Sequence, residues 1–163
     1  MEEIYRKFAD SLLEAEKKWH NSDYLLSVTY KVVKDEKLLL RVLENINKTL
    51  VLLISIILKF EYLHKRIELS NDIKKNLDVF FRKSAVRYGL DENNIDVLKK
   101  IIFLNKKHVE SGLEFSKRGK VFMLDDDMHS FFLDEEFMKS SLNAVKLLLD
   151  SANKIFSSYS RKV

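Results

Sequence analysis

The sequence predicts an all-α fold: an antiparallel bundle of four to five helices with two long N-terminal helices and a small β-hairpin insertion. Proline is absent and glycine occurs only three times in 163 residues, so few positions force a helix to end. Apolar residues recur at alternating steps of three and four, which is typical of helices that pack along one seam. That rhythm changes between residues 113 and 124. We expect a single domain over residues 1–163.

The stretch from Leu38 to Leu63 is the expected centre of the bundle. Between Leu50 and Leu58 every face of a helix would be apolar, which indicates packing from several sides. A membrane span needs about 18 or more uninterrupted apolar residues. Charged side chains cut this run short at both ends, so we expect no membrane span. One seam of the helix consists of Leu39, Leu43, Ile46, Leu50, Leu53, Ile57 and Phe60.

Two long helices are expected over residues 2–33 and 35–66. Side chains that compete for backbone hydrogen bonds cluster between His20 and Asp23. A break or kink there is the alternative to one continuous first helix. A tight reversal follows, with Asp35 as the N-cap of the second helix. Because the two helices have similar lengths, they predict an antiparallel hairpin.

Capping residues predict three further helices, over residues 71–88, 92–110 and 135–159. Ser70-Asn71-Asp72 and Asp91 supply side-chain oxygens for the first two helix starts. Acidic residues in its first turn favour the start of the third helix.

Residues 113–124 are expected to form the β-hairpin. Branched and aromatic residues stand on both sides of Lys117-Arg118-Gly119, a pattern typical of two strands joined by a turn. The acidic segment Asp125 to Ser130 is expected to be a loop. Phe131-Phe132-Leu133 is expected to pack against the bundle as a plug.

Positive charge is concentrated around this hairpin. The formal net charge is +4, but the stretch from Lys99 to Lys120 holds seven basic and two acidic residues, a local charge of +5. Cations beside Phe115 and Phe122 are the combination that holds backbone phosphates and stacks exposed bases. The alternative is that the phenylalanines anchor the hairpin while the cations stay in water. The candidate nucleic-acid-binding residues are Lys106, Lys107, His108, Phe115, Lys117, Arg118 and Lys120.

Other classes of site are poorly matched by the sequence. Cysteine is absent and the four histidines form no H-E-x-x-H pair, so no zinc site is indicated. Asp125-x-Asp127-x-His129 comes closest to a metal site, but loop acids more often cap turns. Three isolated glycines cannot form a phosphate-cradling loop, and no serine stands in a G-x-S-x-G elbow. We assign no catalytic residue, metal ligand or cofactor, and we expect a protein that is not an enzyme.

Two segments follow a pattern found elsewhere. Thr29 to Leu39 reads T-Y-K-V-V-K-D-E-K-L-L, and His108 to Lys120 reads H-V-E-S-G-L-E-F-S-K-R-G-K. They resemble a group of small, uncharacterised archaeal helical proteins that has T-Y-P-L-V-K-D-P-K-L-L and H-x-x-S-P-x-E-F-x-R-K-D-K at these places. The resemblance implies a helical fold and no known activity. The sequence departs from that pattern where three prolines are replaced, by Lys31, Glu36 and Gly112.

The predicted bundle is more loosely similar to the HEPN helical bundles. Many of those proteins are ribonucleases that use an arginine and a histidine four to six residues apart. No arginine in this sequence precedes a histidine at that separation. In particular, the segment Asn105-Lys106-Lys107-His108 lacks the arginine that would precede the histidine. The similarity therefore concerns architecture alone.

Three functions follow from these observations. The leading hypothesis is a non-enzymatic helical-bundle binding protein that contacts RNA or a ribonucleoprotein through the basic hairpin. The alternative is a protein-interaction or homodimerisation module that uses the apolar surplus between Leu50 and Leu58. The third is a HEPN-type ribonuclease that uses His108 with Lys117 or Arg118. The first residues lack the basic and apolar regions of a signal peptide, so we expect a cytoplasmic protein.

Overall fold

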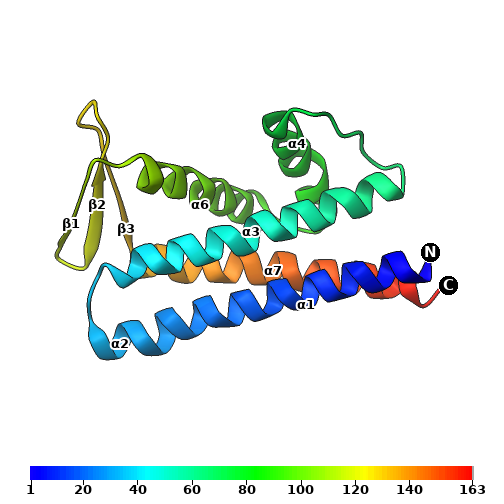
Figure 1. The fold of residues 1–163 in the computed structure, drawn as a ribbon, viewed down its shortest axis with the longest axis horizontal. Helices are drawn as coiled ribbons and strands as arrows, with labels where there is room; N and C mark the ends of the chain where they lie inside the picture. The colour runs from blue at the N-terminus through cyan, green and yellow to red at the C-terminus, as the bar shows by residue number, and fades with distance from the viewer. Residues whose placement is uncertain (163) are drawn as a thin grey trace.

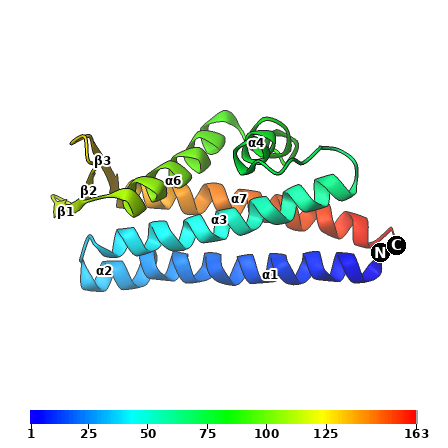
Figure 2. The same cartoon turned by 45° about the horizontal axis from the view of Figure 1, so that its top comes forward.

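The computed structural model describes residues 1–162 and is mostly helical, with one small antiparallel sheet. Three long helical segments lie side by side (Figure 1, Figure 2). The first contains two α-helices joined by a π-helical turn without a break, the second returns beside it, and the third is the C-terminal helix. They are α1 (Glu2–Tyr24) with η1 (Leu25–Thr29) and α2 (Tyr30–Val33), then α3 (Leu38–Leu63), and α7 (Glu135–Ser160).

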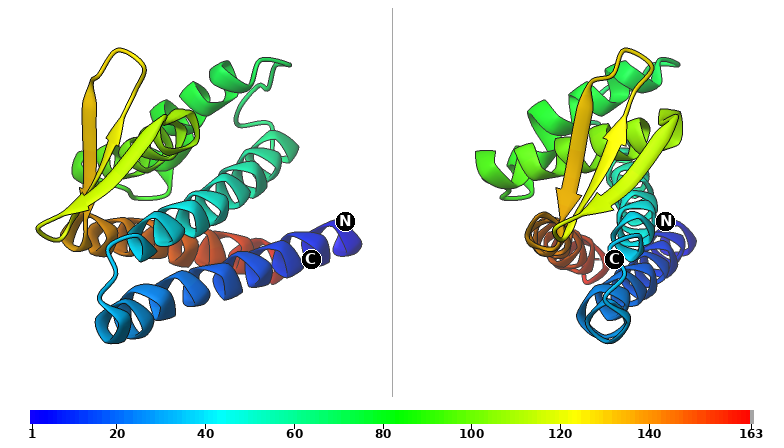
Figure 3. Two further views of the ribbon diagram at one scale, coloured as in Figure 1. Left: turned by 60° about the vertical axis from the view of Figure 1, so that its left-hand side comes forward. Right: turned by 90° about the vertical axis from the view of Figure 1, so that its left-hand side faces the viewer.

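The shorter elements lie between α3 and α7 in the chain. The sheet stands at the end of the long helices where α2 meets α3, and the two chain termini lie at the other end (Figure 1, Figure 3). Its strands are antiparallel in the order β1-β2-β3, so β1 and β3 are both edges. The elements are α4 (Ile73–Val79), η2 (Phe80–Ser84), α5 (Ala85–Arg87), α6 (Glu92–Glu110), β1 (Leu113–Lys117), β2 (Lys120–Leu124) and β3 (Ser130–Asp134).

Side-chain caps explain where several helices begin. The carboxylates of Asp72, Asp91 and Asp134 accept hydrogen bonds from backbone amides in the first turns of α4, α6 and α7. At the reversal between α2 and α3, Lys34 has a φ of 55° and the Asp35 carboxylate accepts a bond of 3.0 Å from the backbone of Lys37. Asp35 is thus not the N-cap of α3 that the sequence predicts; it stabilises the turn before the helix, and Lys37 is the N-cap without a side-chain hydrogen bond.

Two local features differ from the sequence-based expectations. The segment Phe131-Phe132-Leu133 is not a plug but the centre of a third strand, which pairs with β2 along five residues. Its side chains alternate, with Leu133 fully buried and Phe132 exposed. The first helical segment does not break between His20 and Asp23, and its one irregularity is the wider π-helical turn η1 that follows.

The centre of α3 is buried from several sides, as its composition predicts. The helix contacts α1, α6, α7 and η2. Val51 is the exception, with 51% of its surface exposed. No helix within residues 1–162 combines the length and apolar character that a bilayer span requires. The fully buried apolar residues of α3 are Leu39, Val42, Leu43, Ile46, Leu50, Leu53, Ile57 and Phe60.

We predict that Leu53→Ala lowers the free energy of unfolding by about 2 to 5 kcal/mol, because it removes buried methyl groups and leaves a cavity. Val51→Ala, two positions away on the exposed face, should change it by less than about 0.5 kcal/mol. Urea denaturation of both variants measures the difference. Equal losses in the two variants would contradict the burial of Leu53.

A buried carboxylate joins three parts of the fold near the C-terminal end of α3. Glu61 is fully buried, and its Oε1 lies 3.1 Å from a guanidinium nitrogen of Arg66. Arg87 pairs with the other oxygen, and the Tyr88 hydroxyl donates to Oε1 at 3.4 Å. Arg66 also donates to the hydroxyl of Tyr159 on α7. Burial raises the pKa of Tyr88 well above its ordinary value of 10.0, so its hydroxyl stays protonated as a donor.

We predict that Glu61→Gln costs about 3 kcal/mol of unfolding free energy, because it leaves two arginines without their shared carboxylate. The expected loss is at the low end for buried pairs because the Arg66 and Arg87 side chains are about one-third exposed, at 30% and 37%. As a control, Arg82→Ala removes the exposed ion pair with Asp78 and should cost less than about 1 kcal/mol. Thermal or urea unfolding compares the two; a Glu61→Gln loss as small as that of the control would show that the network adds little.

Candidate functional site

The two faces of the sheet differ in character. Side chains alternate along each strand, so Val121, Met123 and Leu133 face the helices and are buried. The opposite face, which we call the outer face, is turned to solvent at the end of the molecule (Figure 3). The sheet is therefore anchored by apolar packing on one side and presents its other side.

A row of three phenylalanines crosses the outer face. Phe115, Phe122 and Phe132 are direct neighbours in the strand register. The rings of Phe115 and Phe122 are nearly parallel, at 13° with centroids 5.2 Å apart, and Phe132 follows 5.8 Å from Phe122. Phe115 and Phe132 keep 40% and 44% of their surface exposed. Because Phe122 covers one ring face of Phe115, the other face is directed away from it, towards the open edge of β1.

A basic turn lies at one end of this row. Arg118 and Gly119 join β1 to β2 with φ values of 52° and 75°, which is the geometry of a type I′ turn. Lys117 and Lys120 flank the turn, and within residues 1–162 none of these three cations forms an ion pair. The Lys120 ammonium instead lies 4.4 Å from the ring centre of Phe132. The turn therefore carries unpaired positive charge next to exposed aromatic rings.

Arg118 occupies a conformation that suits another residue better. A left-handed φ costs an ordinary L-residue about 1 to 2 kcal/mol, whereas asparagine tolerates it and is preferred at this turn position. The chain thus carries a cation where the backbone favours asparagine. Strain retained at an exposed site is a reason to consider a function for the side chain.

We predict that Arg118→Asn stabilises the protein by about 0.5 to 1 kcal/mol, because asparagine relieves the backbone strain. Lys117→Asn removes the same charge from a strand position without positive φ and should give no gain, since asparagine is depleted in strands. Urea midpoints of the two variants test this. A destabilised Arg118→Asn variant would mean that the arginine side chain itself supports the fold.

His108 is not a free cation of this surface. Its Nδ1 lies 2.6 Å from Glu114 Oε2 on β1, and its Nε2 lies 2.7 Å from Glu44 Oε1 on α3. The side chain is only 15% exposed. Burial alone would lower the pKa of His108. Glu44 and Glu114 act in the opposite direction, through their hydrogen bonds to the ring and through their negative charge, and the net effect is a raised pKa. His108 therefore bridges elements instead of facing a ligand.

The two lysines of α6 also lie apart from the outer face. Lys106 is within 3.9 Å of Glu110 one turn further along the helix. The Lys107 ammonium lies 5.0 Å from the ring centre of Phe131. Because side chains alternate along β3, Phe131 is on the opposite face of the sheet from Phe132, so Lys107 is not beside the outer face. Of the seven candidate residues, four thus belong to the outer face and its turn, namely Phe115, Lys117, Arg118 and Lys120.

Sequence reasoning missed several residues of this region. Phe132 was expected in a plug, because three consecutive apolar residues do not show that the middle one faces solvent. Glu44, one of the two partners of His108, is 64 residues away in the chain, and no sequence signal connects them. Only the folded arrangement brings these groups together.

The turn between β2 and β3 carries the opposite charge. Asp125 accepts hydrogen bonds from the backbone amides of Asp127 and His129 and from the His129 ring at 3.1 Å. Desolvation alone would raise the pKa of Asp125, but the hydrogen bonds from His129, the charge of His129 and the hydrogen bond from the Asp127 amide together lower it. The Asp125-x-Asp127-x-His129 group is therefore engaged in holding the turn.

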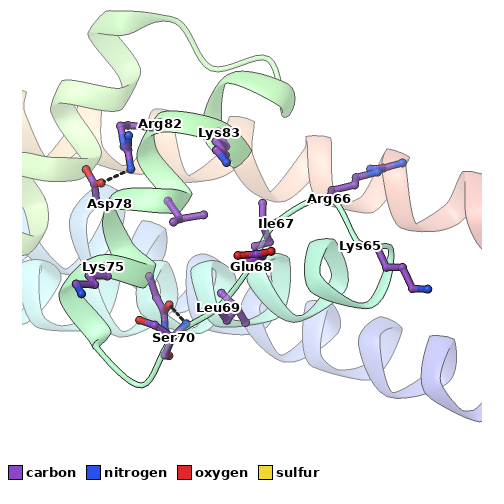
Figure 4. Close-up of a pocket in the computed structure, with 12 residues that line it drawn as sticks. Lys65, Arg66, Ile67, Glu68, Leu69, Ser70, Lys75, Asp78, Arg82 and Lys83 are labelled. Atoms are coloured by element: carbon purple, nitrogen blue, oxygen red, sulfur yellow. Dashed lines mark hydrogen bonds and ion pairs between the residues drawn. The ribbon is translucent and has the colours of Figure 1, made fainter.

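A cleft of about 740 Å³ elsewhere in the molecule is also lined by cations, but none of the described residues that line it is aromatic. It lies between the segment after α3 and the α4–η2 helix (Figure 4). Arg82 is paired with Asp78 at 2.7 Å, and Arg66 is paired with Glu61. Lys65 points away from the cleft (Figure 4), and the carboxylate of Glu68 lies in its lining. Lys75 and Lys83 also line the cleft, and neither forms an ion pair with a described residue. The sheet turn differs because its unpaired charge lies next to exposed aromatic rings, so it is the clearer candidate for a nucleic-acid strand.

Comparison of the chain with models of known protein families, with curated proteins and with solved structures finds no match in any of the three. The function is therefore argued from the geometry of the site.

Proposed function

We propose that this protein is a non-enzymatic binding protein that holds single-stranded RNA, free or within a ribonucleoprotein, on the outer face of its sheet. The observation that carries the proposal is the exposed row Phe115–Phe122–Phe132 beside the unpaired cations of the turn. In this proposal the helices form an antiparallel bundle that supports the sheet and takes no part in chemistry.

Each part of the surface matches one part of a nucleic-acid strand. A base can stack on the free ring face of Phe115, a contact typically worth about 1 to 3 kcal/mol per base. Lys117, Arg118 and Lys120 supply charge for phosphates, and the arginine fork can bind one phosphate through two hydrogen bonds. Stacking and charge together favour an unpaired strand, because bases in a duplex do not expose their faces.

The charges of the two turns set the direction of the bound strand. The basic turn between β1 and β2 lies at one end of the strands, and Asp125, Asp126 and Asp127 lie in the turn at the other end. A polyanion lying along the strands would approach those carboxylates. A path across the strands avoids those three carboxylates over a width of about 10 Å at the usual strand spacing. At the β3 edge this path meets Asp134, which is opposite Lys120 in the register, so the phosphates are expected at the β1–β2 turn.

We predict that Phe115→Ala weakens binding of a fluorescent single-stranded RNA about 5- to 100-fold, as loss of one stacked base implies. Phe103→Ala is the matched control, because Phe103 on α6 is also exposed, at 45%, but contacts Phe131 on the other side of the sheet. Fluorescence anisotropy at low salt gives both dissociation constants. Undetectable binding of the parent protein at low salt, or equal losses in both variants, would remove the proposal.

A charge test accompanies this experiment. If three phosphates are neutralised, the logarithm of affinity should fall with the logarithm of salt with a slope of about −2 for a single strand. Replacing Lys117 and Arg118 by alanine should make that slope shallower. Replacing Lys48 and Lys59, two exposed lysines on α3, should leave it unchanged.

Association with a protein or with a second copy is the alternative function. Most of the apolar surplus between Leu50 and Leu58 is buried within the chain, with Val51 as its exposed member, so that segment offers less support than expected. The support comes from the open edge strand β1 and from Leu113, which is 56% exposed. Light scattering over a wide concentration range distinguishes a self-associating protein from a monomer.

The geometry does not favour a ribonuclease that uses His108. Both ring nitrogens are hydrogen-bonded to carboxylates, so a substrate would have to displace Glu44 or Glu114 to reach either nitrogen.

A further inference from the structure

Strand β1 is held to the rest of the molecule in an unusual way. Four of its five residues are exposed, and the exception is Glu114, whose carboxylate reaches His108 at 2.6 Å. The other nitrogen of that imidazole reaches Glu44 on α3 at 2.7 Å. Beyond its ladder with β2, β1 is therefore linked to the long helices through the chain Glu114–His108–Glu44, which we call the His108 bridge.

The bridge requires a proton on each ring nitrogen. Ionised carboxylates only accept hydrogen bonds, so both nitrogens must donate. An imidazole that donates from both nitrogens is positively charged, whereas the neutral ring carries one proton. When the ring loses one proton, one of its nitrogens holds a lone pair in place of the N–H. That lone pair then faces a carboxylate oxygen, and the hydrogen bond is lost.

Little else supports β1 on its inner side. A cleft of about 360 Å³ lies beneath the strand, between it and the start of α3. Lys37 and Leu40 line the cleft on the α3 side. On the sheet side it is lined by Glu114, Phe115, Ser116 and Val121. Because this space is not filled by apolar side chains, β1 has room to shift once its polar link is lost.

We propose that His108 is a proton-dependent positioning residue: its protonated ring holds β1, and with it Phe115, against the long helices, and loss of the proton breaks one of its two hydrogen bonds and loosens the strand. The proposal concerns the free protein and stands whether or not the outer face binds RNA. If it does bind RNA, the bridge sets the position of the ring that stacks on the base.

The direction of the pH effect follows from the charges around the ring. Desolvation by burial opposes the cation, but Glu44 on α3 and Glu114 on β1 stabilise it by hydrogen bonds and by charge, so the pKa of His108 lies above its ordinary value of 6.5. A raised pKa in the folded state means that the bridge contributes its full stability below about pH 6.5. That contribution is lost as the pH rises through the raised pKa.

We predict that the His108 ring and the backbone amides of residues 113–117 titrate together in a ¹⁵N NMR experiment from pH 6 to pH 9. The shared midpoint should lie above 6.5. In His108→Gln, which keeps hydrogen-bonding capacity but cannot titrate, these amides should no longer shift with pH. His129→Gln is the matched control, because that exposed histidine pairs with Asp125 in its own turn, and the substitution should leave the β1 titration unchanged.

Glu44→Gln provides an independent variant that retains the histidine. Removal of one of the two carboxylates should move the His108 midpoint to lower pH and move the β1 amides with it. If the β1 amides of the parent protein stay constant through the His108 titration, or if His108 titrates at or below pH 6.5, the proposal is overturned. Since all readouts are made without RNA, such a failure is separate from a failure of the binding experiment.

Discussion

The burial of α3 is the constraint around which the rest of the molecule is arranged. A helix that is apolar on nearly every face must be covered from several directions before its hydrocarbon leaves water. In this fold α1 and α7 cover two directions, and α6 and η2 cover others. The sheet has no place in that packing, so it is left at the end of the helices, attached by Val121, Met123 and Leu133 and free on its other face.

The polar residues of α3 locate these covering elements along its length. Glu61, near the C-terminal end, is shared by Arg66 and Arg87 and so fixes the segment that follows the helix. Glu44, near the N-terminal end, accepts from His108 and so reaches α6 and β1. Apolar burial tolerates small sliding of one helix past another, whereas a charged hydrogen bond has a defined partner. The two glutamates therefore add register to an otherwise nonspecific apolar contact.

The features that could be predicted from sequence are those with local causes. Asp91 caps α6 through its own neighbours, and the Arg118-Gly119 turn follows from the residues on both sides of it, so short-range patterns suffice. The third strand was missed because Phe131, Phe132 and Leu133 are all apolar, and the pattern does not show that one of them faces solvent. The role of His108 was missed for a different reason. Against desolvation, Glu44 and Glu114 together raise its pKa, and no pattern along the chain connects His108 with Glu44, which is 64 positions away.

The positions of the two chain ends have a practical consequence. The start of α1 at Glu2 and the end of α7 at Ser160 lie at the same extremity of the molecule, opposite to the sheet (Figure 1, Figure 2). An affinity tag, a fluorophore or a surface attachment at either terminus would therefore sit about the length of a long helix away from Phe115, roughly 40 Å for 26 residues at 1.5 Å per residue. The molecule can be immobilised by either end with the sheet directed into solution, an orientation that suits surface-based assays with large ligands.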